Sequence, residues 1–387
     1  MAALVTVVLC APAGIANAEP VPDPRNDPFY SQPASFTGRT HGQLLNSRPV
    51  DIGVAGVKLP YTAYQLKYVS TDTTGAPQAN VATVLKPLSR TSSPKLVSYQ
   101  PAIDSLSHRC DPSYQLRSGS SLEIPFIAVL LNQGWTVVVP DYLGPDHPWG
   151  ASYVEGHGTL DGIRAAENFA PAGLGGPATP VALTGYSGGA HGTEAAYELA
   201  PTYPPELNIV GAAMGGLGAE ESQVLRGANG RLFSGVVFAK LFGLERAYPT
   251  MGIGDMLNAR GRQLRNRIAA VCVFEYTAAY AFQRVQSYTM NGIDPLFVPA
   301  VTVVFAKNNA GALGAPRAPS YYYNASADEL VEPANVNKLA ARYCARGLKV
   351  QSVTEAGDHA TLWVTGFPGA VNWIAGRFAR TPAPSAC

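Results

Sequence analysis

Short β-branched segments alternate with helix-patterned segments along the middle of the chain, and this alternation limits the fold more than any other feature. We expect strands at residues 96–99, 136–139, 181–184 and 208–214, with helices between them at 122–134, 159–169 and 191–200. Strands that alternate with helices are typical of βαβ units, whose strands pair in parallel. The sequence therefore predicts an α/β protein with a mostly parallel central sheet flanked by helices.

The alternation stops near residue 217 and resumes near residue 297. Between these points Phe233, Val237, Leu241 and Leu244 form an apolar stripe at helical spacing. We expect residues 217–296 to be a helical cap or lid whose stripe contributes to an apolar pocket; a packed helical subdomain without a gating role is the alternative. Further strands are predicted at 298–305, 321–323 and 348–353, and further helices at 333–346 and 362–378.

The remaining boundaries follow from these patterns. Residues 61–216 and 297–387 form the predicted core, and it opens with a β-hairpin made by residues 61–70 and 81–85. Residues 19–60 are rich in proline and weakly periodic, so we expect an arm on the surface of the core.

The first 18 residues have the pattern of a secretory signal. They contain no charged residue, their apolar run from Ala2 to Cys10 is far shorter than the ~20 residues of a membrane span, and they end in Ala16-Asn17-Ala18. The pattern predicts cleavage after Ala18, although the usual basic start is missing. Four cysteines follow, and an even number in an exported chain predicts two disulfides with three possible pairings: Cys110, Cys272, Cys344 and Cys387.

Composition excludes two classes of protein. The 387 residues carry 28 Lys and Arg against 27 Asp and Glu, so the chain lacks the basic excess of a nucleic-acid binder. With 47% hydrophobic and 14% charged residues, it is also too apolar for a disordered chain. We expect a compact, soluble, secreted protein that binds no nucleic acid.

A candidate nucleophile lies in Gly185-Tyr186-Ser187-Gly188-Gly189. This G-x-S-x-G match follows a predicted strand and precedes an Ala-rich helix, which is the context of a nucleophile elbow. Taken alone the match is weak, and a glycine-rich turn without chemistry is the alternative. A serine hydroxyl also needs a base to remove its proton.

Chain order selects the partners of this serine. A nucleophile elbow is followed by an acid and then by a histidine. Beyond Ser187 only His191 and His359 remain, and His191 lies inside the elbow helix. His359 is therefore the predicted base. Asp328, which follows a predicted strand, is the predicted acid, with Glu329 and Glu332 as alternatives.

Several motifs together resemble the secretory lipase family, the lipase A-like enzymes of fungi and actinobacteria. The similarity covers roughly residues 60–380 and rests on the elbow and four other segments: Asp141-Tyr142-Leu143-Gly144-Pro145, Leu160-Asp161-Gly162-Ile163-Arg164-Ala165, Asp328-Glu329-Leu330-Val331 and Gly357-Asp358-His359. The resemblance implies an α/β-hydrolase fold and the same triad of Ser187, Asp328 and His359.

The resemblance implies further roles that the residues alone do not. Asp104 and Gly188 would form the oxyanion hole, with the backbone N–H of Asp104 or its protonated side chain as donor. Cys110 would pair with Cys272, and Cys344 with Cys387. A departure from the family pattern is Glu332, which stands between Val331 and Pro333 where relatives run Val-Pro directly.

The leading prediction is a secreted serine ester hydrolase, a lipase or carboxylesterase, acting on lipid or other acyl esters at a possible lipid–water interface and without a cofactor. An α/β-hydrolase peptidase and a non-catalytic cell-envelope binding protein are the alternatives. His147 and His157 lie among Asp141, Asp146 and Asp161, but they lack a metal-ligand spacing. We therefore expect a hydrogen-bonded loop there and no metal.

Overall fold

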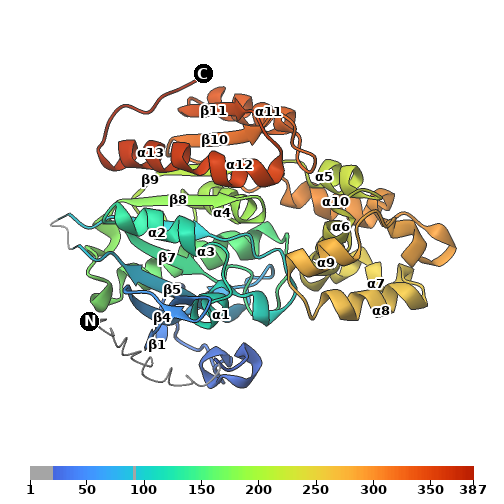
Figure 1. Ribbon diagram of the computed structural model, residues 1–387, viewed down its shortest axis with the longest axis horizontal. Helices are drawn as coiled ribbons and strands as arrows, with labels where there is room; N and C mark the ends of the chain where they lie inside the picture. The colour runs from blue at the N-terminus through green and yellow to red at the C-terminus, as the bar shows by residue number, and fades with distance from the viewer. Residues whose placement is uncertain (1–20, 90–92) are drawn as a thin grey trace, which may run out of the picture.

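The α/β prediction is confirmed by a computed structural model, which describes residues 21–89 and 93–387 (Figure 1). Nine strands form one sheet in the order β1-β4-β5-β7-β6-β8-β9-β10-β11. The pairs β1–β4, β4–β5 and β5–β7 are antiparallel. All pairs from β7 onward in this order are parallel. The strands are β1 (Leu44–Val50), β4 (Thr62–Thr71), β5 (Pro77–Lys86), β6 (Leu96–Gln100), β7 (Thr136–Pro140), β8 (Val181–Tyr186), β9 (Ile209–Gly215), β10 (Ser320–Ala325) and β11 (Val350–Glu355).

Helices cover both faces of the sheet, and each face has its own apolar core. One core joins the sheet to α3 (Ser152–Glu167), α4 (Gly188–Leu199) and α11 (Pro333–Cys344). The other joins it to α2 (Ile124–Asn132), α12 (His359–Thr365) and α13 (Phe367–Phe378). The two cores arise because successive side chains of a strand point to opposite faces of the sheet. In strand β7, Val138 faces the first core, whereas Val137 and Val139 face the second. A strand buried on both faces reads as a continuous apolar run, which is the pattern of these segments.

A third apolar cluster lies in the helices between β9 and β10, which gather at one side of the sheet in Figure 1 (yellow and orange). It also includes Tyr142, Leu143 and Trp149 from the loop after β7. The helices are α5 (Glu221–Ala228), α6 (Ser234–Ala247), α7 (Ile253–Met256), α8 (Ala259–Ile268), α9 (Val273–Ala279) and α10 (Pro299–Asn308). None of the described helices is both long and apolar enough to span a membrane.

Two predicted elements differ in the structure. The strand expected at residues 298–305 is helix α10. Pro299 starts this helix at a position where no N–H is needed, and Val301, Val304, Phe305 and Asn308 are buried at helical spacing, so tertiary packing outweighs the strand preference of the valines. The helix expected at 362–378 is interrupted at Gly366 and forms α12 and α13.

The N-terminal segment also differs from the surface arm that we expected. Its residues 44–50 form β1, which pairs with β4 and extends the sheet. The segment also includes the small hairpin of β2 (Gly53–Val54) and β3 (Val57–Lys58). Helix α1 (Pro112–Ser118) follows β6. The predicted signal peptide, with its cleavage after Ala18, lies outside the described residues.

Candidate active site

Ser187 lies in a sharp turn between β8 and α4. Its backbone has φ 54° and ψ −120°, a conformation that L-residues rarely adopt, and its amide donates to the carbonyl of Gly215 at 2.9 Å. The flanking glycines allow this turn, because a Cβ on Gly185 would lie 2.4 Å from the carbonyl oxygen of Gly189, and one on Gly189 would lie 2.0 Å from that of Gln100. The turn therefore holds the Ser187 hydroxyl at the carboxyl end of the sheet.

His359 lies at the start of α12, after β11, and its Nε2 is 2.8 Å from the Ser187 Oγ. Its Nδ1 is 2.8 Å from Asp328 Oδ2. A carboxylate accepts, so Nδ1 carries the proton and Nε2 presents its lone pair to the serine hydroxyl. The structure thus brings together the three residues that chain order selected.

Asp328 follows β10, and its side chain is fully buried (0% exposed). Its Oδ1 accepts the amides of Leu330 at 3.0 Å and Val331 at 2.8 Å, which leaves Oδ2 for the histidine. Of the two alternative acids, Glu329 accepts the backbone amide of His359 at 3.0 Å, and Glu332 is exposed at the start of α11. Asp328 is therefore the acid that contacts the imidazole ring.

Asp104 and Gly188 lie in direct contact beside the nucleophile. A Cβ on Gly188 would lie only 1.6 Å from Asp104 Oδ1. Asp104 also has a positive φ of 42°, and its carbonyl accepts the hydroxyl of Tyr276 on α9. Burial raises the pKa of the Asp104 carboxyl to about 6, although the nearby Lys240 lowers it. The pair borders the same small cavity as Ser187.

A cavity of about 350 Å³ opens on Ser187 and His359. Its walls are mainly apolar, and among the described residues no Lys or Arg lines it. Two of the apolar lining side chains, Leu122 and Phe274, are each 60% exposed. Other apolar lining residues are Ile103, Phe233, Val236, Val273, Leu330 and Trp363.

The predicted pocket stripe is only partly correct. Phe233 lines the cavity, and its ring lies 6.4 Å from that of His359. Val237, Leu241 and Leu244 are at most 1% exposed and pack inside the helical cluster. None of the three lines the cavity, so they are packing residues and not pocket residues.

Four buried ionisable residues lie next to the site, and of these only His191 was considered from the sequence, as a base that was set aside. Lys240 on α6 pairs with Glu221 on α5 at 2.9 Å, and His191 contacts Glu221 at 3.2 Å and Glu155 on α3 at 2.6 Å. Burial alone would lower the pKa of Lys240, but the two glutamates raise it above its usual value. A single Lys within the apolar segment from Val236 to Leu244 is the signal that indicates a buried partner.

Lys240 also lines a second, small cavity of about 50 Å³ beside Ser187 and Gly188. His191 and Glu221 line the same cavity, so one side of the nucleophile faces charged groups and the other faces the apolar cavity.

Both disulfides are present in the structure, Cys110 with Cys272 and Cys344 with Cys387. The first joins the segment after β6 to the helices between β9 and β10, and Cys110 and Cys272 also line the apolar cavity. The second fixes the C-terminal residue to the end of α11.

Known proteins resemble this chain over nearly its whole length. A probable inactive lipase of Mycobacterium tuberculosis is 35% identical and aligns with 93% of this chain and 83% of its own. A secreted triacylglycerol lipase of Malassezia furfur is 30% identical, with 93% of this chain and 81% of its own covered. The X-ray structure of Candida antarctica lipase A superposes with a TM-score of 0.88 at 31% identity, covering 95% of this chain and 89% of that one.

The sequence pattern of one protein family, described as secretory lipase, matches residues 115–386, which include the elbow, the acid and the histidine. That match covers well over half of the chain. The protein therefore belongs to the secretory lipase family.

Proposed function

We propose that this protein is a secreted serine ester hydrolase that cleaves lipid or other acyl esters through an acyl-enzyme on Ser187. The observation that carries the proposal is the unbroken hydrogen-bonded chain from Asp328 through His359 to the Ser187 hydroxyl, which opens into an apolar cavity. A glycine-rich turn without chemistry would not need a histidine at hydrogen-bond distance on one side and a buried carboxylate behind it.

The reaction has two halves. His359 Nε2 takes the hydroxyl proton as Ser187 Oγ attacks the ester carbonyl, and the tetrahedral intermediate then expels the alcohol, which receives that proton from His359. Water attacks the resulting acyl-serine in the second half, with His359 again as base and then as acid. The carboxylic acid product leaves, and Ser187 regains its proton from His359.

Asp328 and the oxyanion residues stabilise the charges that form during the reaction. Asp328 holds the Nδ1–H tautomer and stabilises the imidazolium that forms in each half, so its position matters more than its own protonation. The amides of Gly188 and Asp104 would donate to the oxyanion. An ionised Asp104 carboxylate would repel that oxyanion, so the protonated form favours the reaction.

The cavity and the family both support a lipid ester as substrate. Mainly apolar walls without a basic side chain suit an acyl chain better than the carboxylate terminus of a peptide. A relative from Malassezia furfur is named as a secreted triacylglycerol lipase, so we propose acylglycerols or similar lipid esters as substrates. The exposed Leu122 and Phe274 would contact the lipid–water interface.

We further propose that residues 217–296 act as a cap over the core of residues 61–216 and 297–387. Phe233, Val236 and Phe274 from this segment line the cavity and would cover a bound acyl chain. A cap of this kind excludes water from the oxyanion chemistry.

One relative is named a probable inactive lipase, so a non-catalytic role is the alternative that the experiment must address. Purified protein is assayed on p-nitrophenyl esters from acetyl to long acyl chains and on a panel of peptide p-nitroanilides, with Ser187→Ala as control. We expect Ser187-dependent ester hydrolysis. Activity on the anilides alone would identify a peptidase, and no activity on either would support a binding protein.

A further inference from the structure

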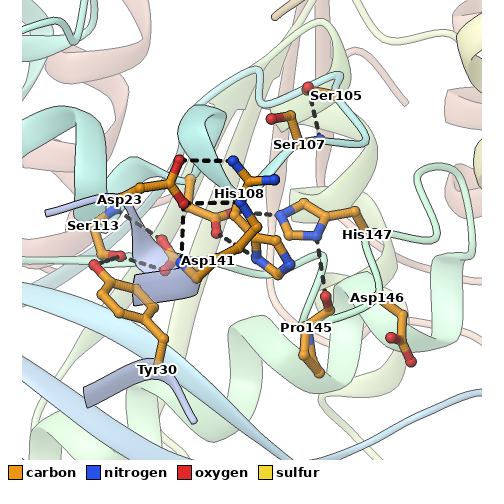
Figure 2. A network of polar contacts seen from close by, with 12 residues as sticks. Asp23, Tyr30, Ser105, Ser107, His108, Ser113, Asp141, Pro145, Asp146 and His147 are labelled. Atoms are coloured by element: carbon orange, nitrogen blue, oxygen red, sulfur yellow. Dashed lines mark hydrogen bonds and ion pairs between the residues drawn. The ribbon is translucent and has the colours of Figure 1, made fainter. Parts of the chain in front are cut away.

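A cluster of polar residues from the segment after β6 and the loop after β7 lies outside the triad and is not used in the proposed reaction. It consists of His108, Asp111 and His147, which we call the His-Asp-His cluster. One ligand atom from each residue lies within 4.8 Å of the other two, and this is the one group of three metal-ligating side chains found within residues 21–89 and 93–387. Figure 2 shows His108 and His147 pointing toward one another, with Ser113 and Asp141 close by.

The hydrogen bonds of His147 leave a position for a cation. Its Nδ1 lies 3.3 Å from the carbonyl oxygen of Pro145, an acceptor, so Nδ1 carries a proton. Its Nε2 lies 2.6 Å from Asp111 Oδ1, which is also an acceptor. Two acceptors at this distance share a proton, which a metal ion bound to both atoms would displace while lengthening their separation. A backbone carbonyl that fixes Nδ1–H is the usual outer partner of a metal-binding histidine.

Asp111 is shared between the two histidines. It precedes α1 as the N-cap residue, but its side chain makes no capping hydrogen bond. Its second oxygen instead lies 3.6 Å from His108 Nδ1, and the two imidazole rings are 4.4 Å apart, edge to face. Ligands around tetrahedral Zn²⁺ are about 3.4 Å apart, given bonds of ~2.0–2.1 Å. The 3.6 Å between His108 Nδ1 and Asp111 Oδ2 is close to that value. The 2.6 Å between His147 Nε2 and Asp111 Oδ1 is a hydrogen-bond distance, which would lengthen when both atoms bind one ion.

The cluster also borders a cavity. His108 and Asp111 line a cavity of about 550 Å³, together with Asn80 and Asp141. The cavity gives an ion and its bound water a route to the cluster.

We propose that His108, Asp111 and His147 bind one divalent transition-metal ion, with Zn²⁺ as the preferred ion. Two imidazoles and one carboxylate suit Zn²⁺, whereas Ca²⁺ and Mg²⁺ prefer oxygen ligands alone. The fourth position is open to water from the cavity. The ion joins the segment that carries Cys110 to the loop that leads to Trp149, so its role is structural, and the triad keeps its own geometry without it.

The test uses the full oxidised chain, stripped with EDTA and titrated with Zn²⁺ in a calorimeter and with Co²⁺ in a spectrophotometer. We expect one Zn²⁺ per chain at micromolar or lower Kd, Co²⁺ absorption bands of a four-coordinate site with nitrogen ligands, and a Tm that rises with Zn²⁺ but not with Mg²⁺. Replacing the ligands, Asp111→Asn or His147→Gln, should weaken binding at least about 100-fold, since loss of an outer partner alone costs 10–100-fold.

Asp146→Asn is the matched control, because Asp146 lies on the same loop, is exposed and is outside the cluster. Its affinity for Zn²⁺ should equal that of the unmodified chain. Equal Zn²⁺ binding by the ligand variants, or the absence of a Co²⁺ spectrum, would overturn the proposal and leave a proton between Asp111 and His147.

If a buried variant fails to fold by circular dichroism, His108→Gln replaces it, since the side chain of His108 is 35% exposed. Ester hydrolysis by the stripped chain is measured in parallel. Its outcome tests the proposed function and is independent of the metal result.

Discussion

At the scale of single residues, the unusual backbone angles occur where the proposed chemistry needs them. Ser187 and Asp104 both have positive φ, and each such non-glycine residue costs about 1–3 kcal/mol. Packing compensates for this cost, since the Ser187 amide donates to Gly215 and Tyr276 fixes the carbonyl of Asp104. The strain is therefore held by neighbouring elements next to the proposed nucleophile.

The first prediction concerns the triad. Ser187→Ala and His359→Ala should each lower kcat for ester hydrolysis by ~10⁴ or more, because the serine without its base and the base without the serine are equally inactive. The double variant should be little worse than either single one. Steady-state kinetics on a p-nitrophenyl ester checks this, and additive losses would mean that the two residues do not share a step.

The second prediction concerns Asp104. Its pKa is raised from 3.8 to about 6 by burial, so between these values the folded chain binds a proton that the unfolded chain has lost. The contribution of the Asp104 carboxyl to the free energy of unfolding is therefore fully present below pH 3.8 and decreases as the pH rises to about 6. One pKa unit of difference between the folded and unfolded states corresponds to about 1.4 kcal/mol of this free energy.

The variant Asp104→Asn cannot ionise and should escape this loss. The free energy of unfolding of both chains is measured by urea titration. The value for Asp104→Asn minus that for the unmodified chain should increase steadily from about pH 4 to pH 6 and then stay constant. A difference that is constant with pH would show that the Asp104 carboxyl is not desolvated.

At the scale of elements, helix α6 shows what a sequence pattern can and cannot predict. The stripe of Phe233, Val237, Leu241 and Leu244 correctly predicts a helix with a buried face. Three of these residues pack into the helical cluster and not around the cavity. The prediction failed there because periodicity identifies an apolar face of a helix but not what packs against it. Helix α10 illustrates the opposite limit, since its valines favour a strand when read without their packing partners.

The third prediction follows from the corrected pocket. Phe274→Ala removes an apolar lining side chain and should lower kcat/KM for long-chain esters about 5- to 30-fold, the equivalent of 1–2 kcal/mol, with little effect on an acetyl ester. Phe282→Ala is the matched control, because Phe282 is 68% exposed in the same group of helices but does not line the cavity. Equal losses on both esters would show that Phe274 supports packing and does not contact the acyl chain.

At the scale of the whole molecule, two disulfides join distant parts of the chain. Their residues are 162 and 43 positions apart, so in the chain-entropy model they stabilise the fold by about 5 and about 4 kcal/mol. The longer loop joins the core to the helices that line the cavity. Most of the stabilisation of that junction against unfolding is therefore expected from Cys110–Cys272.

The fourth prediction tests this difference. Titration of the denatured chain that begins at Glu19 should find no free thiol, because all four cysteines after that point are paired. Replacing Cys110 and Cys272 by Ser should lower the free energy of unfolding by about 1 kcal/mol more than replacing Cys344 and Cys387, as measured in urea. Two or more free thiols, or no loss of stability in either variant, would contradict the prediction.

Much of the architecture and the candidate triad could be predicted from the sequence, since parallel strands place their following loops at one edge of the sheet. Ser187, Asp328 and His359 each follow a predicted strand, and chain order leaves few alternatives. Contacts between distant elements could not be predicted in this way. Lys240 with Glu221, and His147 with Asp111, depend on which helix or loop packs against which, and no local pattern contains that information.

The proposed function requires that Ser187 is a nucleophile activated by His359. Covalent labelling with a fluorophosphonate ester, followed by proteolysis and mass spectrometry of the labelled peptide, tests this requirement. We expect one label per chain on Ser187, with labelling strongly slowed in His359→Ala. A chain that stays unlabelled, or that carries its label on another residue, would exclude Ser187 as the activated nucleophile.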